Sequence, residues 1–126
     1  PLTSRLLSGN KQVTSAMFSM LKAGSRIARH RGPYLGVIRC HIPLLVPTGD
    51  CGICVAGEVF RWQHGIPLVF DDTLEHEAWN STKEDRVVLF LDFVRPFPFP
   101  LNILNRLLIR LIGISPFIGR MVRKGF

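Results

Sequence analysis

The sequence has no acidic side chain outside its central part. All 9 Asp and Glu residues lie between Asp50 and Asp92, and the flanks carry basic charges only, which gives the 126-residue chain a formal net charge of +7. Basic flanks suit nucleic acid or an anionic membrane surface. Because the 9 Phe and 2 Trp accompany apolar sequence rather than a polar Lys- and Arg-rich patch, the composition favours a membrane surface and predicts no nucleic acid partner.

Cysteine is scarce as well. The 3 cysteines are an odd number, so no disulfide framework is expected. Cys51 and Cys54 have the spacing of a redox motif, but they lie in a strand-like run and not at the start of a helix, which favours ordinary buried thiols. No segment resembles a secretory signal, and no stretch of about 18 residues is free of charge, so no plain transmembrane span is predicted.

Short strand-like runs separated by turn residues dominate the chain. A chain of this length forms one domain with a single core. Strands are expected at residues 10–21, 34–46, 52–56, 59–62, 66–70 and 86–94, and residues 71–80 are expected to form a polar loop that bears His76. This pattern predicts an antiparallel sandwich or jelly roll, an all-β fold with flanking helices. Because the chain begins at Pro1 and not at Met, we expect a fragment or a processed product.

The hydrophobic period changes after residue 95. Residues 101–114 have helical spacing, with a leucine stripe on one side and polar and basic residues on another. The stripe consists of Leu104, Leu107, Leu108 and Leu111. We therefore divide the chain into a β-domain, residues 1–95, and a basic amphipathic segment, residues 96–126. The helix either packs on the sandwich or lies in a membrane interface, and the second alternative predicts a membrane-associated protein.

Arg86 is the strongest candidate for a binding residue. Alternation along residues 86–94 places Arg86 on the same inward face as Val88, Phe90 and Asp92. A buried guanidinium is costly unless an anion pairs with it, so Arg86 either pairs with Asp92 or another acid, or binds a small dianion. Arg39 and His41 share the inward face of a second strand. They too either pair with an acid or contribute to a site for an anion.

Two histidines, His30 and His76, each lie beside a strand-like run. Neutral imidazole binds iron, zinc, copper or nickel, so a pair of histidines does not name the metal, and single histidines also occur in loops and cores without any ligand. Non-haem iron oxygenases usually have a carboxylate two residues after the first histidine, where this chain has Gly32. The acids around His76 could complete a metal shell, although a solvated acidic loop explains them more simply.

Four motifs nonetheless resemble those of the aspartyl/asparaginyl β-hydroxylases, a family of iron(II)- and 2-oxoglutarate-dependent dioxygenases. They are His30-Arg31-Gly32-Pro33-Tyr34, Arg39-Cys40-His41, the run from Phe70 to Asn80, and Asp85-Arg86-Val87-Val88-Leu89, in the order and at the spacing of the family. The resemblance covers roughly residues 17 to 95 and implies a double-stranded β-helix, a cupin-like jelly roll. The family tolerates glycine at the position of Gly32, and water is then the expected ligand there.

The resemblance also implies roles for individual residues. His30 and His76 would bind Fe(II), Arg86 and Ser19 would hold the distal carboxylate of the co-substrate 2-oxoglutarate, and Arg39 and His41 would lie around its metal-side end or the substrate. Dioxygen would be the oxidant, and no catalytic residue is expected beyond the metal ligands. Such an enzyme hydroxylates an unactivated C–H bond.

The resemblance leaves two substrate classes, a lipid A acyl chain and a peptidyl Asp or Asn side chain. Peptide-acting members tend to carry an arginine two positions before Arg39, where this chain has Val37. The basic, apolar segment after residue 96 resembles the tail of the lipid-modifying branch and suits an anionic membrane surface, so a lipid is slightly favoured. The alternative to an enzyme is a catalytically inactive sandwich that binds an anion or a membrane lipid.

Overall fold

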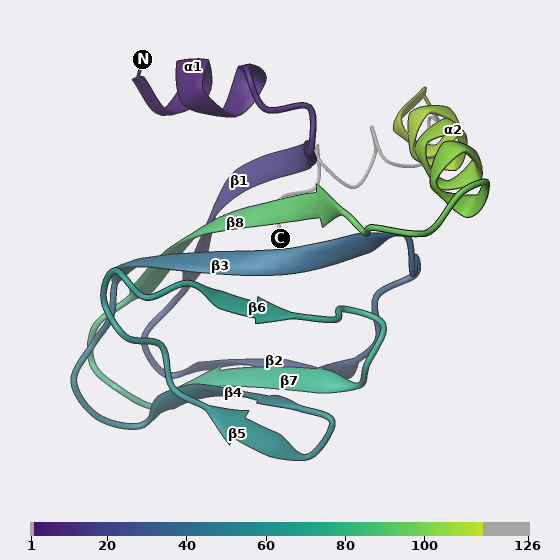
Figure 1. The fold of residues 1–126 in the computed structure, drawn as a ribbon. Coiled ribbons are helices and arrows are strands. Elements are labelled where there is room, and N and C mark those ends of the chain that lie inside the picture. The colour runs from purple at the N-terminus through teal and green to yellow at the C-terminus, as the bar shows by residue number, and fades with distance from the viewer. Residues whose placement is uncertain (1, 115–126) are drawn as a thin grey trace.

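The fold consists of two stacked four-stranded sheets, with one helix before the first strand and another after the last strand. The computed structural model describes residues 2–114, and the later part of the predicted C-terminal segment, residues 115–126, lies outside them (Figure 1). The elements are α1 Leu2–Ser8, β1 Val13–Leu21, β2 Ser25–His30, β3 Val37–Leu45, β4 Cys51–Val55, β5 Glu58–Phe60, β6 Leu68–Phe70, β7 His76–Asn80, β8 Arg86–Val94 and α2 Leu101–Ile114.

The chain passes back and forth between the two sheets. One sheet has the order β1-β8-β3-β6 and the other β2-β7-β4-β5, and all pairings are antiparallel. Among the strands of residues 2–114, only β4 and β5 are both consecutive in the chain and adjacent in a sheet. They are joined by Ala56 and Gly57, whose φ angles of 50° and 85° are those of a tight hairpin turn. This winding is that of a jelly roll, so the predicted all-β fold with flanking helices is confirmed.

The core fills the space between the inner faces of the sheets. Its buried residues come from both sheets and from the loop after β5, and they are Leu21, Cys51, Ile53, Val55, Trp62, Phe70, Ala78 and Val88. The predicted alternation holds at the start of β8, where Arg86 and Val88 are buried and Val87 is half-buried. It does not hold further on, because Leu91 on the other face is buried and Phe90 is only half-buried.

Two strands differ from the prediction. Residues 76–80 form β7 and not a polar loop, and β2 has no counterpart among the predicted strands. The two pair with each other, and Arg26 and Arg29 of β2 reach Glu77 of β7 at 2.6 and 3.1 Å. The sequence hides this strand because the buried positions of β7 are His76, Ala78 and Asn80, which are not the β-branched or aromatic residues typical of a strand.

No helix in the described part of the chain is long and apolar enough to cross a membrane. The predicted helix Leu101–Ile114 is confirmed with these bounds as α2.

Candidate active site

The pairing of β2 with β7 brings His30 and His76 together. The two residues are direct cross-strand partners, and their ring centroids lie 4.2 Å apart. His76 is buried at the inner end of this pair, whereas His30 is exposed at the end of β2. The two predicted metal ligands therefore meet at the edge of the sandwich, where one ring faces the core and the other faces solvent.

Backbone carbonyls fix the hydrogen positions on both rings. Nδ1 of His30 lies 2.8 Å from the carbonyl oxygen of Ala28, and Nδ1 of His76 lies 2.8 Å from that of Leu74. A carbonyl only accepts hydrogen bonds, so each Nδ1 carries the hydrogen, and in the neutral ring Nε2 keeps its lone pair. Such a hydrogen bond orients a histidine for metal binding through Nε2. The two rings are thus suited to hold a divalent metal.

Asp72, one of the acids expected in a solvated loop around His76, lies beside this pair. It is 2% exposed, and its Oδ1 lies 3.4 Å from Nε2 of His76. The Gly32 amide donates to the Asp72 carbonyl at 2.7 Å, and a Cβ on Gly32 would lie only 1.6 Å from Oδ2 of Asp72. The Asp72 carboxylate therefore occupies the space that a side chain at position 32 would need.

The acids around His76 are consequently not one solvated loop. Asp72 is buried, Asp71 binds Arg95 at 2.6 Å, and only Glu75 remains largely exposed. A carboxylate oxygen facing an Nε2 lone pair is favourable when a cation, a proton or a water hydrogen lies between them. Within residues 2–114, no group of three or more His, Cys, Asp or Glu side chains is arranged to hold a metal. The two histidines are thus the ligands that these residues offer, with Asp72 next to them.

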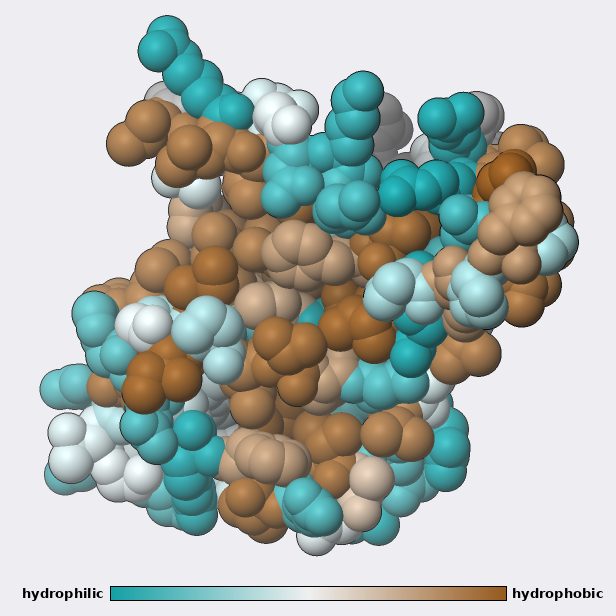
Figure 2. Space-filling model, viewed as in Figure 1, coloured by the Kyte–Doolittle hydropathy of each residue, from teal (hydrophilic) through white to brown (hydrophobic). Residues whose placement is uncertain are grey.

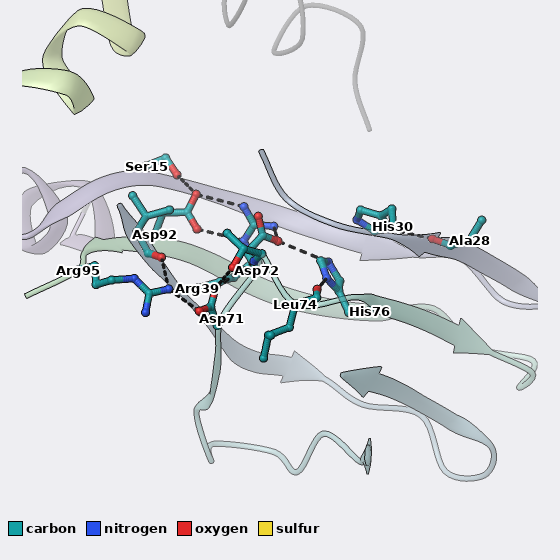
Figure 3. A network of polar contacts seen from close by, with 12 residues as sticks. Ser15, Ala28, His30, Arg39, Asp71, Asp72, Leu74, His76, Asp92 and Arg95 are labelled. Atoms are coloured by element: carbon teal, nitrogen blue, oxygen red, sulfur yellow. Dashed lines mark hydrogen bonds and ion pairs between the residues drawn. The ribbon is translucent and has the colours of Figure 1, made fainter. Parts of the chain in front are cut away.

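Arg39 connects this region to the opposite sheet. It pairs with Asp72, its Nε lies 3.0 Å from Oδ1 of Asp92, and Ser15 donates to Oδ2 of Asp92 at 3.0 Å (Figure 3). The guanidinium also lies over the Phe90 ring, 4.1 Å from its centroid. Asp92 is therefore the partner of Arg39, its cross-strand neighbour on β3, and the alternative pairing of Asp92 with Arg86 is wrong.

Arg86 is a buried cation without an acid partner among the described residues. It is 1% exposed, and its Nε and Nη1 atoms are buried with no hydrogen-bond partner in that part of the chain. The guanidinium lies 4.4 Å from the centroid of the Trp62 ring, and burial lowers its pKa to about 10. Cation–π contact offsets only part of the cost of removing the charge from water. The environment of Arg86 is therefore suited to an anion.

His41 presents a further unpartnered donor to the same region. The Trp62 indole donates to Nδ1 of His41 at 3.4 Å, which leaves the hydrogen of the neutral ring on Nε2. His41 is 7% exposed, and Nε2 is buried without a partner among residues 2–114. Burial first, and then the charges of Arg86 and Arg39, lower the pKa of His41 to about 3. His41 is therefore neutral near pH 7 and can donate to an anion beside Arg86.

Ser19 is on the inner face of the same sheet. It is half-buried on β1 opposite Val88, and Arg86 is opposite Leu21, two residues further along β1. Paired residues and their second neighbours share one face, so the Ser19 and Arg86 side chains lie on the same side of the sheet. The structure thus divides the predicted site residues into a metal-suited pair, His30 and His76, and a group around Arg86.

The low pKa of His41 predicts acid sensitivity of the folded state. An unfolded histidine takes up a proton below about pH 6.5, whereas folded His41 stays neutral, so the free energy of unfolding should fall as the pH falls from about 6.5 towards 3. Between about pH 6.5 and pH 5, the free energy of unfolding of the wild type should fall by roughly 1.5–2 kcal/mol more than that of His41→Gln. Urea unfolding at the two pH values measures this, and equal slopes in both proteins would show that folded His41 is protonated.

Known proteins resemble this chain both in fold and in sequence. A predicted oxalate decarboxylase of Thermotoga maritima has a TM-score of 0.55 at 17% identity, with 70% of this chain and 72% of that one covered. The cupin domain of an XRE-family transcriptional regulator of Enterobacter cloacae has a TM-score of 0.53 at 16% identity, with 64% of this chain and 81% of that one covered. The chain is thus a cupin-like jelly roll. The aspartyl/asparaginyl beta-hydroxylase family matches residues 1–96, and the chain belongs to that family, as its motifs predicted.

Two relatives indicate how the family divides. The ornithine lipid ester-linked acyl 2-hydroxylase of Rhizobium tropici is 47% identical over 108 residues, which are 84% of this chain and 38% of that protein. The human aspartyl/asparaginyl beta-hydroxylase is 33% identical over 79 residues, which are 63% of this chain and 10% of that protein. This chain therefore spans well under half the length of these relatives, one of which is named for a lipid and the other for amino-acid side chains.

Proposed function

We propose that this chain carries the active site of an iron(II)- and 2-oxoglutarate-dependent hydroxylase that acts on the acyl chain of a membrane lipid. The observation that carries the proposal is the orphaned guanidinium of Arg86, a buried cation with two unpartnered nitrogens and no acid beside it among residues 2–114. A small dicarboxylate supplies the missing charge. Its second acidic end can then extend towards a metal.

The described residues fit both groups. His30 and His76 would hold Fe(II) through Nε2, because their Nδ1 atoms are committed to backbone carbonyls. Asp72 would accept a hydrogen bond from a water in the coordination place that Gly32 leaves without a ligand. The bound metal with dioxygen would convert 2-oxoglutarate to succinate and carbon dioxide, with one oxygen atom passing to a C–H bond of the substrate.

The residues around Arg86 would bind and orient the co-substrate. Arg86 would grip the distal carboxylate, with Ser19 and the Nε2 hydrogen of His41 as further donors. Trp62 covers the guanidinium and excludes water, so the charge pair would form in a dry environment. Arg39, held between Asp72 and Asp92, would position the Asp72 carboxylate beside His76 rather than bind the co-substrate as its main partner.

The substrate proposal rests on the relatives. The Rhizobium tropici protein that is named an acyl 2-hydroxylase matches more of this chain, and at higher identity, than the human protein named for Asp and Asn. A lipid substrate would also bring the enzyme to a membrane surface. Hydroxylation of peptidyl Asp or Asn is the second candidate, favoured by the family match itself.

The test is to supply the purified chain with Fe(II), 2-oxoglutarate and dioxygen, together with either vesicles of an acylated amino-acid lipid or an Asp- and Asn-containing peptide. We expect succinate, and mass spectrometry should find one added oxygen in a lipid acyl chain and none in the peptide. Samples with a chelator in place of iron are the control. An oxygen in the peptide would reassign the substrate, and the absence of iron-dependent succinate would overturn the proposal.

A further inference from the structure

Helix α2 contacts the sandwich mainly through Asn105, and Asn102, Ile109 and Ile112 on the same side are half-buried. Asn105 is 5% exposed, its Nδ2 donates to the carbonyls of Gly36 at 2.9 Å and Arg95 at 3.3 Å, and its Oδ1 accepts from the Tyr34 hydroxyl at 2.5 Å. A Cβ on Gly36 would lie 2.1 Å from Oδ1 of Asn105, so the glycine allows this close approach. Buried, fully paired hydrogen bonds fix one orientation of the helix.

The apolar side of α2 consequently points away from the sandwich. Its residues recur at helical spacing and are between 39% and 59% exposed, and we call them the apolar stripe: Leu101, Ile103, Leu104, Leu107, Leu108 and Leu111. Apolar side chains cover the outer side of α2 in Figure 2. A helix on the surface of a globular domain normally turns such a stripe to the core. The helix therefore packs on the sandwich, as one of the two alternatives predicted, but its contact is made on the side of Asn105 and leaves the leucines exposed.

The charges beside the apolar stripe indicate what covers it. Arg106 and Arg110 lie next to the stripe, and α2 contains no acidic residue. Arg106 is held by Gln12 at 3.2 Å, and Arg110 is exposed. Phe99, just before the helix, is 78% exposed and adds to the apolar surface, and Phe and Leu are typical of the apolar side of interfacial helices. An apolar stripe edged by arginines complements an anionic bilayer, since leucines match the acyl region and guanidinium groups match phosphates.

We infer that α2 is the membrane-docking surface of this protein and lies in the plane of an anionic bilayer with its apolar stripe immersed. This docking surface rests on the proposed function, because a lipid substrate is the reason for the enzyme to bind a membrane. It names the part of the protein that would contact the bilayer holding that substrate. The docking itself depends on the fixed orientation of the helix and is measurable without turnover.

The experiment is flotation of the purified chain with vesicles of phosphatidylcholine alone or mixed with phosphatidylglycerol. We expect binding to the anionic vesicles, weakened by salt. The variant Leu104→Glu/Leu108→Glu should lose about a hundredfold or more in partition coefficient. Its matched control, Val59→Glu/Ile66→Glu, adds the same charge at two comparably exposed apolar residues away from α2 and should lose far less. Arg110→Gln should lose roughly fivefold on anionic vesicles and nothing on neutral ones.

Three results would overturn the inference. They are a wild type that floats with neither vesicle, equal losses in the α2 variant and the control, and sedimentation that shows the apolar stripe joining two copies of the chain in place of vesicle binding. Iron-dependent succinate formation in solution is measured on the same samples. Because uncoupled turnover needs no bilayer, normal turnover without flotation would reject the docking surface alone, and flotation without turnover would reject the proposed chemistry alone.

Discussion

Replacing His30 with alanine should reduce iron-dependent succinate formation by more than about a hundredfold, because even residues behind a metal ligand cost roughly 10–100-fold when removed. The fold should persist, since the His30 side chain is exposed at the end of an edge strand. Of the two histidines His30 is the more informative to remove. His76 is buried, so a loss of turnover in His76→Ala would also reflect altered packing of the sandwich.

The measurements are succinate formation, Fe(II) affinity and circular dichroism on the same samples. His64→Ala is the matched control, because His64 is also an exposed histidine but lies in the turn after Trp62. We expect the control to keep wild-type iron affinity. A folded His30→Ala protein with unchanged metal affinity and turnover would remove His30 from the metal site.

Alternation along a strand is enough to predict the inward position of Arg86. It is not enough to predict the partner of Arg86, because the partner depends on which strands pair and in what register. Asp92 is on the same inward face as Arg86, yet the β3–β8 register sets it opposite Arg39, which binds it. The sequence could therefore predict that Arg86 is buried, whereas only the strand pairing shows that Asp92 does not pair with it.

The burial of Asp72 and the contacts of Trp62 could not be predicted, for a related reason. Asp72 stands in a run of acids, and its burial depends on a contact with Gly32, forty residues earlier in the chain. The spacing of four residues between Asp72 and His76 is the only local clue. Trp62 lies in a loop, and its contacts with Arg86 and His41 join segments that no local pattern connects. Motifs name the residues of this site, whereas long-range packing determines what each of them touches.

Arg86→Met should change affinity and stability in opposite directions. Loss of the guanidinium should weaken 2-oxoglutarate binding by about 2–5 kcal/mol, because the dianion would enter a dry site without its partner. The ligand-free variant should be as stable as the wild type or more stable, by up to roughly 1–4 kcal/mol, because methionine fills the space without a buried, unpaired charge. If the role of Arg86 were purely structural, its replacement would lower the free energy of unfolding of the protein instead.

Urea unfolding with and without 2-oxoglutarate separates the two effects, since a ligand that binds only the folded state raises its stability. The keto acid should stabilise the wild type and not Arg86→Met. Arg61→Met is a close control, because Arg61 also lies over a tryptophan, 5.2 Å from the Trp79 centroid, but on the surface with Asp50 at 2.7 Å. The control should keep its stabilisation by 2-oxoglutarate. Equal stabilisation of all three proteins would mean that the dianion binds elsewhere and that the burial of an unpaired cation at Arg86 has another cause.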